Sequence, residues 1–226
     1  MTLGRRVGAL LAYVLALLGL MVGLGLLVTT VLFDDWPLTQ EDEVSAALAE
    51  EHSPTWDDVT AVVSWLANTG VIITMMLVVA VAFRLAFHRW LESIFLVVAV
   101  SVQAAVFLLT TMVIDRERPN VEHLDIAPPT SSFPSGHTGA ATALCVSVAV
   151  VLAWHTRRRW VRALIIGLLV LAPVAVAAAR LYRGMHHPTD VLASFLNGGL
   201  SSLIAGQVTL HPDRSPTASP DEKVSQ

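Results

Sequence analysis

The fold of this chain is most constrained by six apolar runs that contain no charged residue. A bilayer core about 30 Å thick needs about 20 such residues per helix, and the run lengths cluster around that value. Hydrophobic residues make up 54% of the chain and charged residues 14%, which is unusual for a soluble domain. We therefore predict an all-α, polytopic membrane protein with six transmembrane helices in a bundle. The runs are residues 7–33, 59–83, 93–114, 138–154, 163–179 and 191–210.

The basic residues between these runs indicate how the chain is oriented in the membrane. Four groups of arginine and lysine fall on one face of the predicted bundle, whereas residues 34–58 hold nine acidic residues and no basic one. Because cytoplasmic loops are enriched in Lys and Arg, both termini are expected in the cytoplasm and segment 34–58 outside. No basic soluble surface supports nucleic-acid binding. The four groups are Arg5 and Arg6; Arg84 and Arg89; Arg157, Arg158, Arg159 and Arg162; and Arg214 and Lys223.

The chain divides into one long domain and a short tail. Residues 1–210 are expected to form the six-helix transmembrane domain, with the first run kept as an uncleaved helix because no clear cleavage site follows it. Residues 211–226 are rich in Pro, Ser and charge, which predicts a disordered cytoplasmic tail. Segment 34–58 has two interpretations. Val44, Ala47 and Leu48 at helical spacing favour a short amphipathic helix, and the acidic composition equally suits a solvated loop.

Four arginines are expected on the outer face, at the ends of the third and fifth predicted helices. They are Arg116, Arg118, Arg180 and Arg183. Guanidinium groups carry planar forks of N–H donors that match phosphate oxygens, so arginines that converge from separate loops suggest an oxyanion site. The alternative is that they anchor the protein to lipid headgroups.

The stretch FPSGHTG, residues 133–139, begins the fourth predicted helix. Pro134 and Ser135 suit a helix start, and Gly136 permits close approach to the backbone. Unpaired N–H groups and the helix dipole at such an end attract anions. His137 lies in the first turn and is therefore expected to face the same anion.

The third outer segment, ARLYRGMHHPTDVL, adds an imidazole and a carboxylate. Pro188 suits the first position of the sixth helix, which places Asp190 in the first turn. Asp190 is expected to hydrogen-bond one nitrogen of His186 and to leave the other nitrogen as a nucleophile. His187 is the alternative partner, although its backbone is biased to be extended because it precedes proline.

Taken together, these three segments resemble the type 2 phosphatidic acid phosphatase family, whose pattern is KxxxxxxRP, then PSGH, then SRxxxxxHxxxD. The resemblance covers residues from about 7 to 210. The matching residues are Arg118, Pro119, Pro134, Ser135, Gly136, His137, Arg180, His186 and Asp190. Two positions depart from the pattern. Thr111 stands in place of the first lysine and Ala179 in place of the third-motif serine, and Lys223 is the one lysine in the chain.

The resemblance implies a lipid phosphate phosphatase with its active site at the extracytoplasmic ends of the helices. It implies that His186 attacks phosphorus to form a phosphohistidine, that Asp190 orients His186, and that His137 protonates the leaving oxygen. The phosphoryl oxygens would be held by Arg118, Arg180, Ser135 and the Gly136 amide, with Arg116 added as a substitute for the missing lysine.

We expect no metal cofactor, because arginines supply the positive charge that phosphoryl transfer needs. Zinc on His137, His186 and Asp190 is the alternative, but two neighbouring arginines would repel a dication. The substrate is expected to be a membrane lipid phosphate, either a polyprenyl diphosphate or a phosphatidate-like lipid. The competing function is a non-enzymatic binder or transporter of anionic lipid, a degenerate family member that uses the arginines without histidine chemistry. Neither the lipid nor the oligomeric state follows from the sequence.

Overall fold

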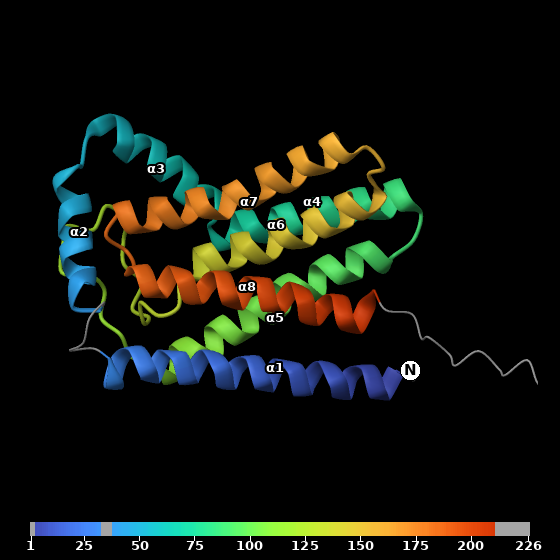
Figure 1. The fold of residues 1–226 in the computed structure, drawn as a ribbon, viewed down its shortest axis with the longest axis horizontal. Helices are drawn as coiled ribbons and strands as arrows, with labels where there is room; N and C mark the ends of the chain where they lie inside the picture. The colour runs from blue at the N-terminus through green and yellow to red at the C-terminus, as the bar shows by residue number, and fades with distance from the viewer. Residues whose placement is uncertain (1–2, 33–37, 211–226) are drawn as a thin grey trace, which may run out of the picture.

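The computed structural model describes residues 3–32 and 38–210, and this part of the chain is an all-helical bundle without strands (Figure 1). Six of its helices are long and apolar enough to cross a membrane, which confirms the predicted fold class. They are α1 (Leu3–Leu26, continued by a π-helical turn, Leu27–Val31), α4 (Thr69–Phe87), α5 (Leu91–Val113), α6 (Gly136–His155), α7 (Arg159–Tyr182) and α8 (Pro188–Thr209).

Helix boundaries differ from the predicted runs in one important place. The run 59–83 does not form one helix, because α3 (Pro54–Leu66) ends within it and the second spanning helix, α4, begins at Thr69. The break comes at Asn68, whose backbone is extended and whose side chain accepts a hydrogen bond from the Thr69 amide, as an N-cap does. The sequence is apolar on both sides of Asn68, so the uncharged run did not reveal this cap. Phe33, at the end of the first run, and the predicted tail 211–226 lie outside the described residues.

From Leu38 onward, where the structure describes it, the acidic segment between the first two spans is mostly helical, so the solvated-loop interpretation was wrong for this part. It contains a 3-10 turn (Leu38–Gln40), α2 (Glu41–Glu50) and then α3. Figure 1 shows α2 across the end of the bundle where α7 ends and α8 begins, with α3 leading back from it toward α4. The N-terminus and the end of α8 lie at the opposite end of the bundle.

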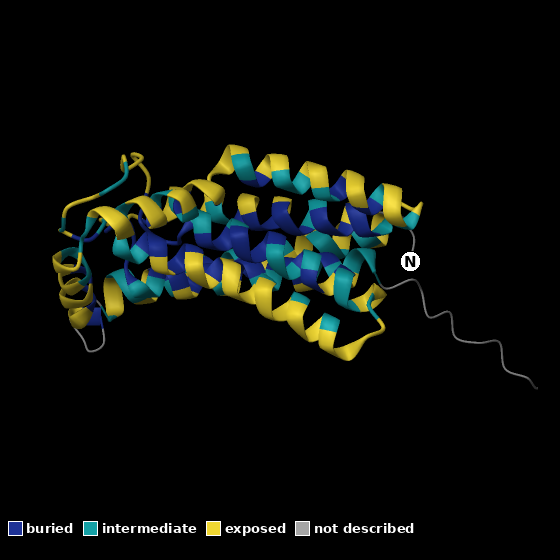
Figure 2. Ribbon diagram, turned by 90° about the horizontal axis from the view of Figure 1, so that it is seen from above, coloured by how far each residue is buried: buried dark blue, intermediate teal, exposed yellow. Residues whose placement is uncertain are grey.

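The bundle is centred on α5, α6 and α8. In the most apolar window of these three helices 44 to 50% of residues are buried, against 11 to 17% in α1, α4 and α7. Figure 2 shows the buried residues along the middle of the bundle and the exposed ones on its outer faces. An outward apolar face suits a helix whose surroundings are lipid chains.

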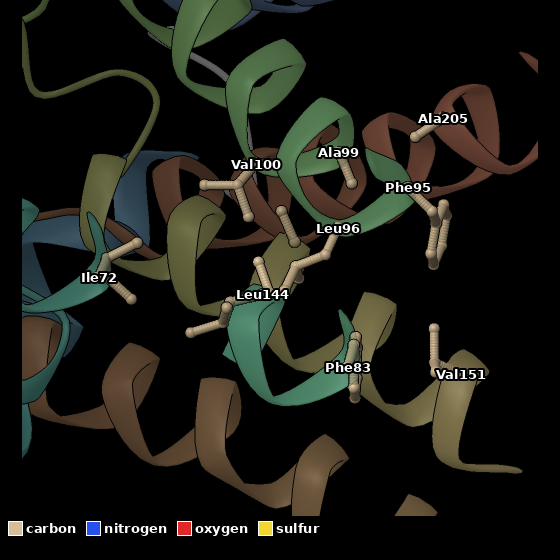
Figure 3. Close-up of a cluster of buried hydrophobic side chains, with 11 residues drawn as sticks. Ile72, Phe83, Phe95, Leu96, Ala99, Val100, Leu144, Val151 and Ala205 are labelled. Atoms are coloured by element: carbon tan, nitrogen blue, oxygen red, sulfur yellow. The ribbon is translucent and has the colours of Figure 1, made fainter. Parts of the chain in front are cut away.

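The largest buried cluster joins α4, α5, α6 and α8 (Figure 3). Phe95 and Leu96 on α5 pack here with Phe83 of α4 and Leu144 of α6. A second cluster joins α1 to α5 and α8 and includes Phe133, which directly precedes the PSGH motif. The packed core therefore fixes the beginning of α6 relative to the beginning of α8, and this is where the candidate site lies.

Candidate active site

Three segments that are far apart in the sequence meet at the end of the bundle crossed by α2. These are the α5–α6 connection, the beginning of α6, and the turn from α7 to α8 (Figure 1). The Ser135 amide donates to the Asp190 carbonyl at 3.2 Å, and the Arg118 guanidinium donates to the Met185 carbonyl at 2.6 Å. The structure therefore brings together the segments that carry the motif residues.

His186 is held in a buried turn. Gly184, two residues before it, has a φ of +67°, and a side chain there would meet the Glu122 carbonyl oxygen at 2.8 Å. The His186 ring is 2.8 Å through Nδ1 from the Ser132 carbonyl oxygen. Because a carbonyl only accepts, Nδ1 carries the proton and Nε2 keeps its lone pair. Burial lowers the pKa of His186, and although the nearby Asp190 acts to raise it, burial together with the charges of Arg180 and Arg118 outweighs this, so the neutral ring is favoured.

Asp190 lies in the first turn of α8, as predicted, and is fully buried. Its carboxylate accepts hydrogen bonds from the Ser132 hydroxyl at 2.5 Å, the His187 amide at 2.8 Å and Arg116 Nη1 at 2.5 Å. The predicted hydrogen bond to His186 is not made, because Asp190 Oδ2 lies 3.8 Å from His186 Nδ1. The tautomer expected for His186 is present, but the Ser132 carbonyl holds it and Asp190 acts as a nearby charge.

His137 lies in the first turn of α6, directly after Gly136. Ser135 precedes the helix without a side-chain cap, and its hydroxyl lies 3.1 Å from the Thr138 hydroxyl. Close packing also explains why residue 136 is a glycine, which the sequence did not suggest: a side chain there would come within 2.8 Å of the Phe107 ring. The His137 imidazole lies near enough to Arg180, Arg118 and Asp125 for their charges to act on it.

Arg180 is buried, and the residues that bind its guanidinium are not motif residues. Its Nη1 donates to Asp125 at 2.5 Å and to the Ser64 hydroxyl at 2.8 Å, whereas its buried Nε has no partner among the described residues. The other Asp125 oxygen accepts from Arg183 at 2.8 Å. Burial of Asp125 raises its pKa, but the Arg183 hydrogen bond and the charges of both arginines outweigh this and hold the pKa below its usual value. Arg180 therefore keeps one edge of its fork for a further acceptor.

Arg118 lies beside an open groove of about 700 Å³. Its guanidinium donates to two backbone carbonyls, Met185 at 2.6 Å and, less closely, Thr130 at 3.4 Å. The groove runs along the end of α5, where Thr111 and Met112 line it, and Met112 is 69% exposed. A cation at one side and an apolar, outward-facing helix end at the other suit a ligand with an anionic head and a lipid chain.

Arg116 lines the same groove as Arg118, but its guanidinium is already paired. Its guanidinium is bound between two carboxylates, with Nη2 at 2.6 Å from Glu41 and Nη1 at 2.5 Å from Asp190. Nη1 also donates to the Thr189 hydroxyl at 2.7 Å. The geometry therefore favours a supporting role for Arg116, and the missing lysine at Thr111 has no evident substitute from this residue.

Several residues that shape the site were not predicted from the sequence. Ser132 contacts both His186 and Asp190. It stands directly before the FPSGH stretch, and this proximity to a motif could have marked it as a site residue. Glu41 and Asp125 gave no comparable signal, because a carboxylate in a segment between predicted spans looks like a solvated one. Ser64 gave none because it falls within the predicted span 59–83. Within residues 3–32 and 38–210, no three His, Cys, Asp or Glu side chains are grouped so as to hold a metal ion.

Comparison with known proteins gives relatives of one kind. The chain is 29% identical over 153 residues to the putative undecaprenyl-diphosphatase YbjG of Escherichia coli, a match that covers 62% of this chain and 72% of that protein. It is 35% identical over 85 residues to an undecaprenyl-diphosphatase of Sulfolobus acidocaldarius, covering 38% of this chain and 37% of that one.

The fold matches a solved membrane protein as well. The crystal structure of a transmembrane PAP2-type phosphatidylglycerolphosphate phosphatase from Bacillus subtilis superposes with a TM-score of 0.76 at 19% identity, covering 89% of this chain and 98% of that one. The family model of the PAP2 superfamily matches residues 65–211, which include all three motif segments. Since that match takes in more than half of the sequence, the chain belongs to the PAP2 superfamily.

Proposed function

We propose that this protein is a lipid phosphatase that releases phosphate from a membrane lipid through a phosphohistidine at His186. The observation that carries the proposal is a buried, neutral imidazole with a free Nε2, set beside a buried arginine, Arg180, whose Nε has no partner in the described part of the chain. A phosphoryl group between them would satisfy both the nucleophile and the donor. Simple binding of a lipid headgroup has no use for an oriented neutral imidazole.

In the first step, His186 Nε2 attacks phosphorus and the bond from phosphorus to the lipid oxygen breaks. His137 gives a proton to that leaving oxygen. Arg118, the free edge of Arg180 and the first amides of α6 stabilise the charge on the phosphoryl oxygens. In the second step, water attacks phosphorus, its proton passes to His137, and the P–N bond breaks to release phosphate and neutral His186.

The groove beside Arg118 supports a proposal for the substrate class. A phosphate held by arginines at one side and a chain along the exposed end of α5 describe an amphipathic lipid phosphate. Two relatives are named as undecaprenyl-diphosphatases, so a polyprenyl diphosphate is the first substrate to test, with phosphatidate-like monophosphates second. The arginine distribution in the sequence supports an extracytoplasmic site with both termini in the cytoplasm.

The test is phosphate release in detergent from a panel of lipid monophosphates and diphosphates, with EDTA present. His186→Asn is the informative variant, because its amide can still donate to the Ser132 carbonyl but has no nucleophilic lone pair. His88→Asn is the matched control, since His88 lies in the connection between α4 and α5 at the opposite end of the bundle.

We expect the parent and His88→Asn to release phosphate and His186→Asn to release none. Release that survives His186→Asn, or that stops with EDTA, overturns the phosphohistidine mechanism. Tight binding of lipid phosphate without any release by the parent would indicate a non-enzymatic anionic-lipid binder.

A further inference from the structure

Glu41 is a buried carboxylate that belongs to the outer segment and lies before the region matched by the family model. It begins α2 and is 5% exposed. Its carboxylate accepts hydrogen bonds from Arg116 Nη2 at 2.6 Å, the Thr189 amide at 2.7 Å and the Thr189 hydroxyl at 3.1 Å. One outer residue therefore binds both Arg116 and the first turn of α8.

Arg116 extends this contact to Asp190. Its side chain is 13% exposed, and its Nη1 donates to Asp190 Oδ1 while its Nη2 donates to Glu41. Using both terminal nitrogens fixes the plane of the guanidinium, which a single point charge such as an ammonium group does not do. Without this cation, two buried carboxylates would lie close together uncompensated.

The two oxygens of Asp190 have different partners. Oδ1 accepts from Arg116, whereas Oδ2 accepts from the Ser132 hydroxyl and the His187 amide and faces His186 Nδ1 at 3.8 Å. Anchoring Oδ1 therefore determines which oxygen faces the histidine and at what distance. A chain of contacts leads from Glu41 through Arg116 and Asp190 to His186.

We propose that Glu41 and Arg116 are positioning residues that hold Asp190 beside the nucleophile, and that Arg116 does not bind the substrate phosphate. This inference rests on the proposed role of His186 and adds residues that the motif pattern does not contain. Glu41 draws Arg116 toward α2, which keeps the guanidinium from serving as a replacement for the lysine that is absent at Thr111. A positioning role and a phosphate-binding role give different kinetics, because loss of position lowers kcat whereas loss of a ligand raises KM.

The experiment compares Arg116→Gln and Glu41→Gln, alone and combined, with the parent. Glu43→Gln is the matched control, because it makes the same change at an exposed position two residues along the same helix. For each protein kcat, KM and the inhibition constant of inorganic phosphate are measured on the most active lipid phosphate. Arg116→Gln should lower kcat about 100-fold, the scale expected for a displaced catalytic group. Glu41→Gln should lower it about 10-fold, as expected for one charged hydrogen bond.

Phosphate inhibition and KM should stay within about twofold of the parent, and the double variant should be no slower than Arg116→Gln alone because the two residues act in series. Glu43→Gln should match the parent. Glu41→Asp, which keeps the charge on a shorter side chain, should fall between Glu41→Gln and the parent. Unchanged phosphate inhibition also shows that the variants retain a folded site.

A tenfold weaker phosphate inhibition in Arg116→Gln would make Arg116 a phosphate ligand and overturn the proposal. Multiplying effects in the double variant, or a Glu41→Gln rate equal to that of Glu43→Gln, would do the same. His186→Asn is run alongside to separate the two hypotheses. If it abolishes release while the Glu41 and Arg116 variants match the control, the positioning role alone fails; if it leaves release intact, the proposed function fails.

Discussion

Replacing Ser132 with alanine tests how the site holds its carboxylate. Ser132 contributes two atoms to the site, the carbonyl that accepts from His186 and the hydroxyl that donates to Asp190 Oδ2 at 2.5 Å. Alanine removes the hydroxyl and keeps the carbonyl, so the tautomer of His186 is preserved. The variant therefore reports the support given to Asp190 and little else.

The expected size follows from the burial of the pair. A hydrogen bond to a charged group contributes about 1.5 to 3 kcal/mol, and Ser132 and Asp190 are both fully buried, so water does not easily replace the lost donor. Asp190 keeps its bonds to the His187 amide and Arg116, which limits the loss to this one interaction. Since about 1.4 kcal/mol corresponds to tenfold in rate, we expect kcat to fall about 10- to 150-fold.

The assay is phosphate release from a lipid phosphate, with kcat and KM determined separately and thermal unfolding followed in the same detergent. Ser147→Ala is the control, because the Ser147 hydroxyl is also buried but pairs with Ser202, between α6 and α8 and away from the site. We expect both variants to lose stability and only Ser132→Ala to lose kcat. A Ser132→Ala enzyme with at least half of the parent kcat would refute the view that Asp190 must be fixed for catalysis.

Three further predictions concern other parts of the site. Because the pKa of His186 is below its ordinary value of 6.5, kcat/KM should hold below pH 6.5 and fall only at more acid pH, where the nucleophile becomes protonated; a pH–rate profile with its acid limb at or above 6.5 would contradict this. Thr111→Lys adds a cation to the groove beside Arg118 and should tighten phosphate inhibition about fivefold, whereas no change would mean that the added cation does not reach the phosphate. Asp125→Asn should lower the free energy of unfolding by about 1 to 2 kcal/mol, because Arg180 and Arg183 stay buried without their carboxylate while solvent at Asp125, 28% exposed, moderates the loss; melting curves against the exposed Glu122→Gln check it.

The transmembrane helices could be predicted because the requirement that creates them is local. Lipid chains offer no hydrogen bonds, so a long uncharged run must satisfy its backbone within itself. The helix boundary at Asn68 was not predicted, because the uncharged run continues on both sides of it. The N-cap at Asn68 starts a new helix there despite the continuous apolar sequence. The helices α6 and α7 extend beyond their predicted runs because each continues into charged or polar residues at its ends, where an uncharged run stops.

The gathering of the motif residues could be predicted for a related reason. Each motif lies at a helix end. Because successive spans run in opposite directions, the ends of α5 and α7 and the beginnings of α6 and α8 lie on the same side of the bundle. Their partners could not be predicted, because they depend on contacts between distant segments. Glu41 is 148 residues from Thr189, and Ser64 is 116 residues from Arg180, so no periodicity connects them. The expected phosphate contact of Arg116 followed from spacing alone, and spacing did not reveal that a carboxylate on α2 lies within reach of its guanidinium.

The charge balance of the four arginines that were predicted on the outer face indicates where a phosphate would bind. Arg116, Arg180 and Arg183 each form an ion pair with a carboxylate, so most of their charge is compensated before any substrate arrives. Arg118 differs, because its hydrogen bonds go to the backbone carbonyls of Met185 and Thr130 and it forms no ion pair with a carboxylate among the described residues. An anion is drawn most strongly to a cation that is not already paired, and the unpaired edge of Arg180 supplies directional donors beside it. The substrate phosphate should therefore lie between Arg118 and that edge, within reach of both histidines, and substitution of Arg118 should raise KM more than substitution of any other outer arginine.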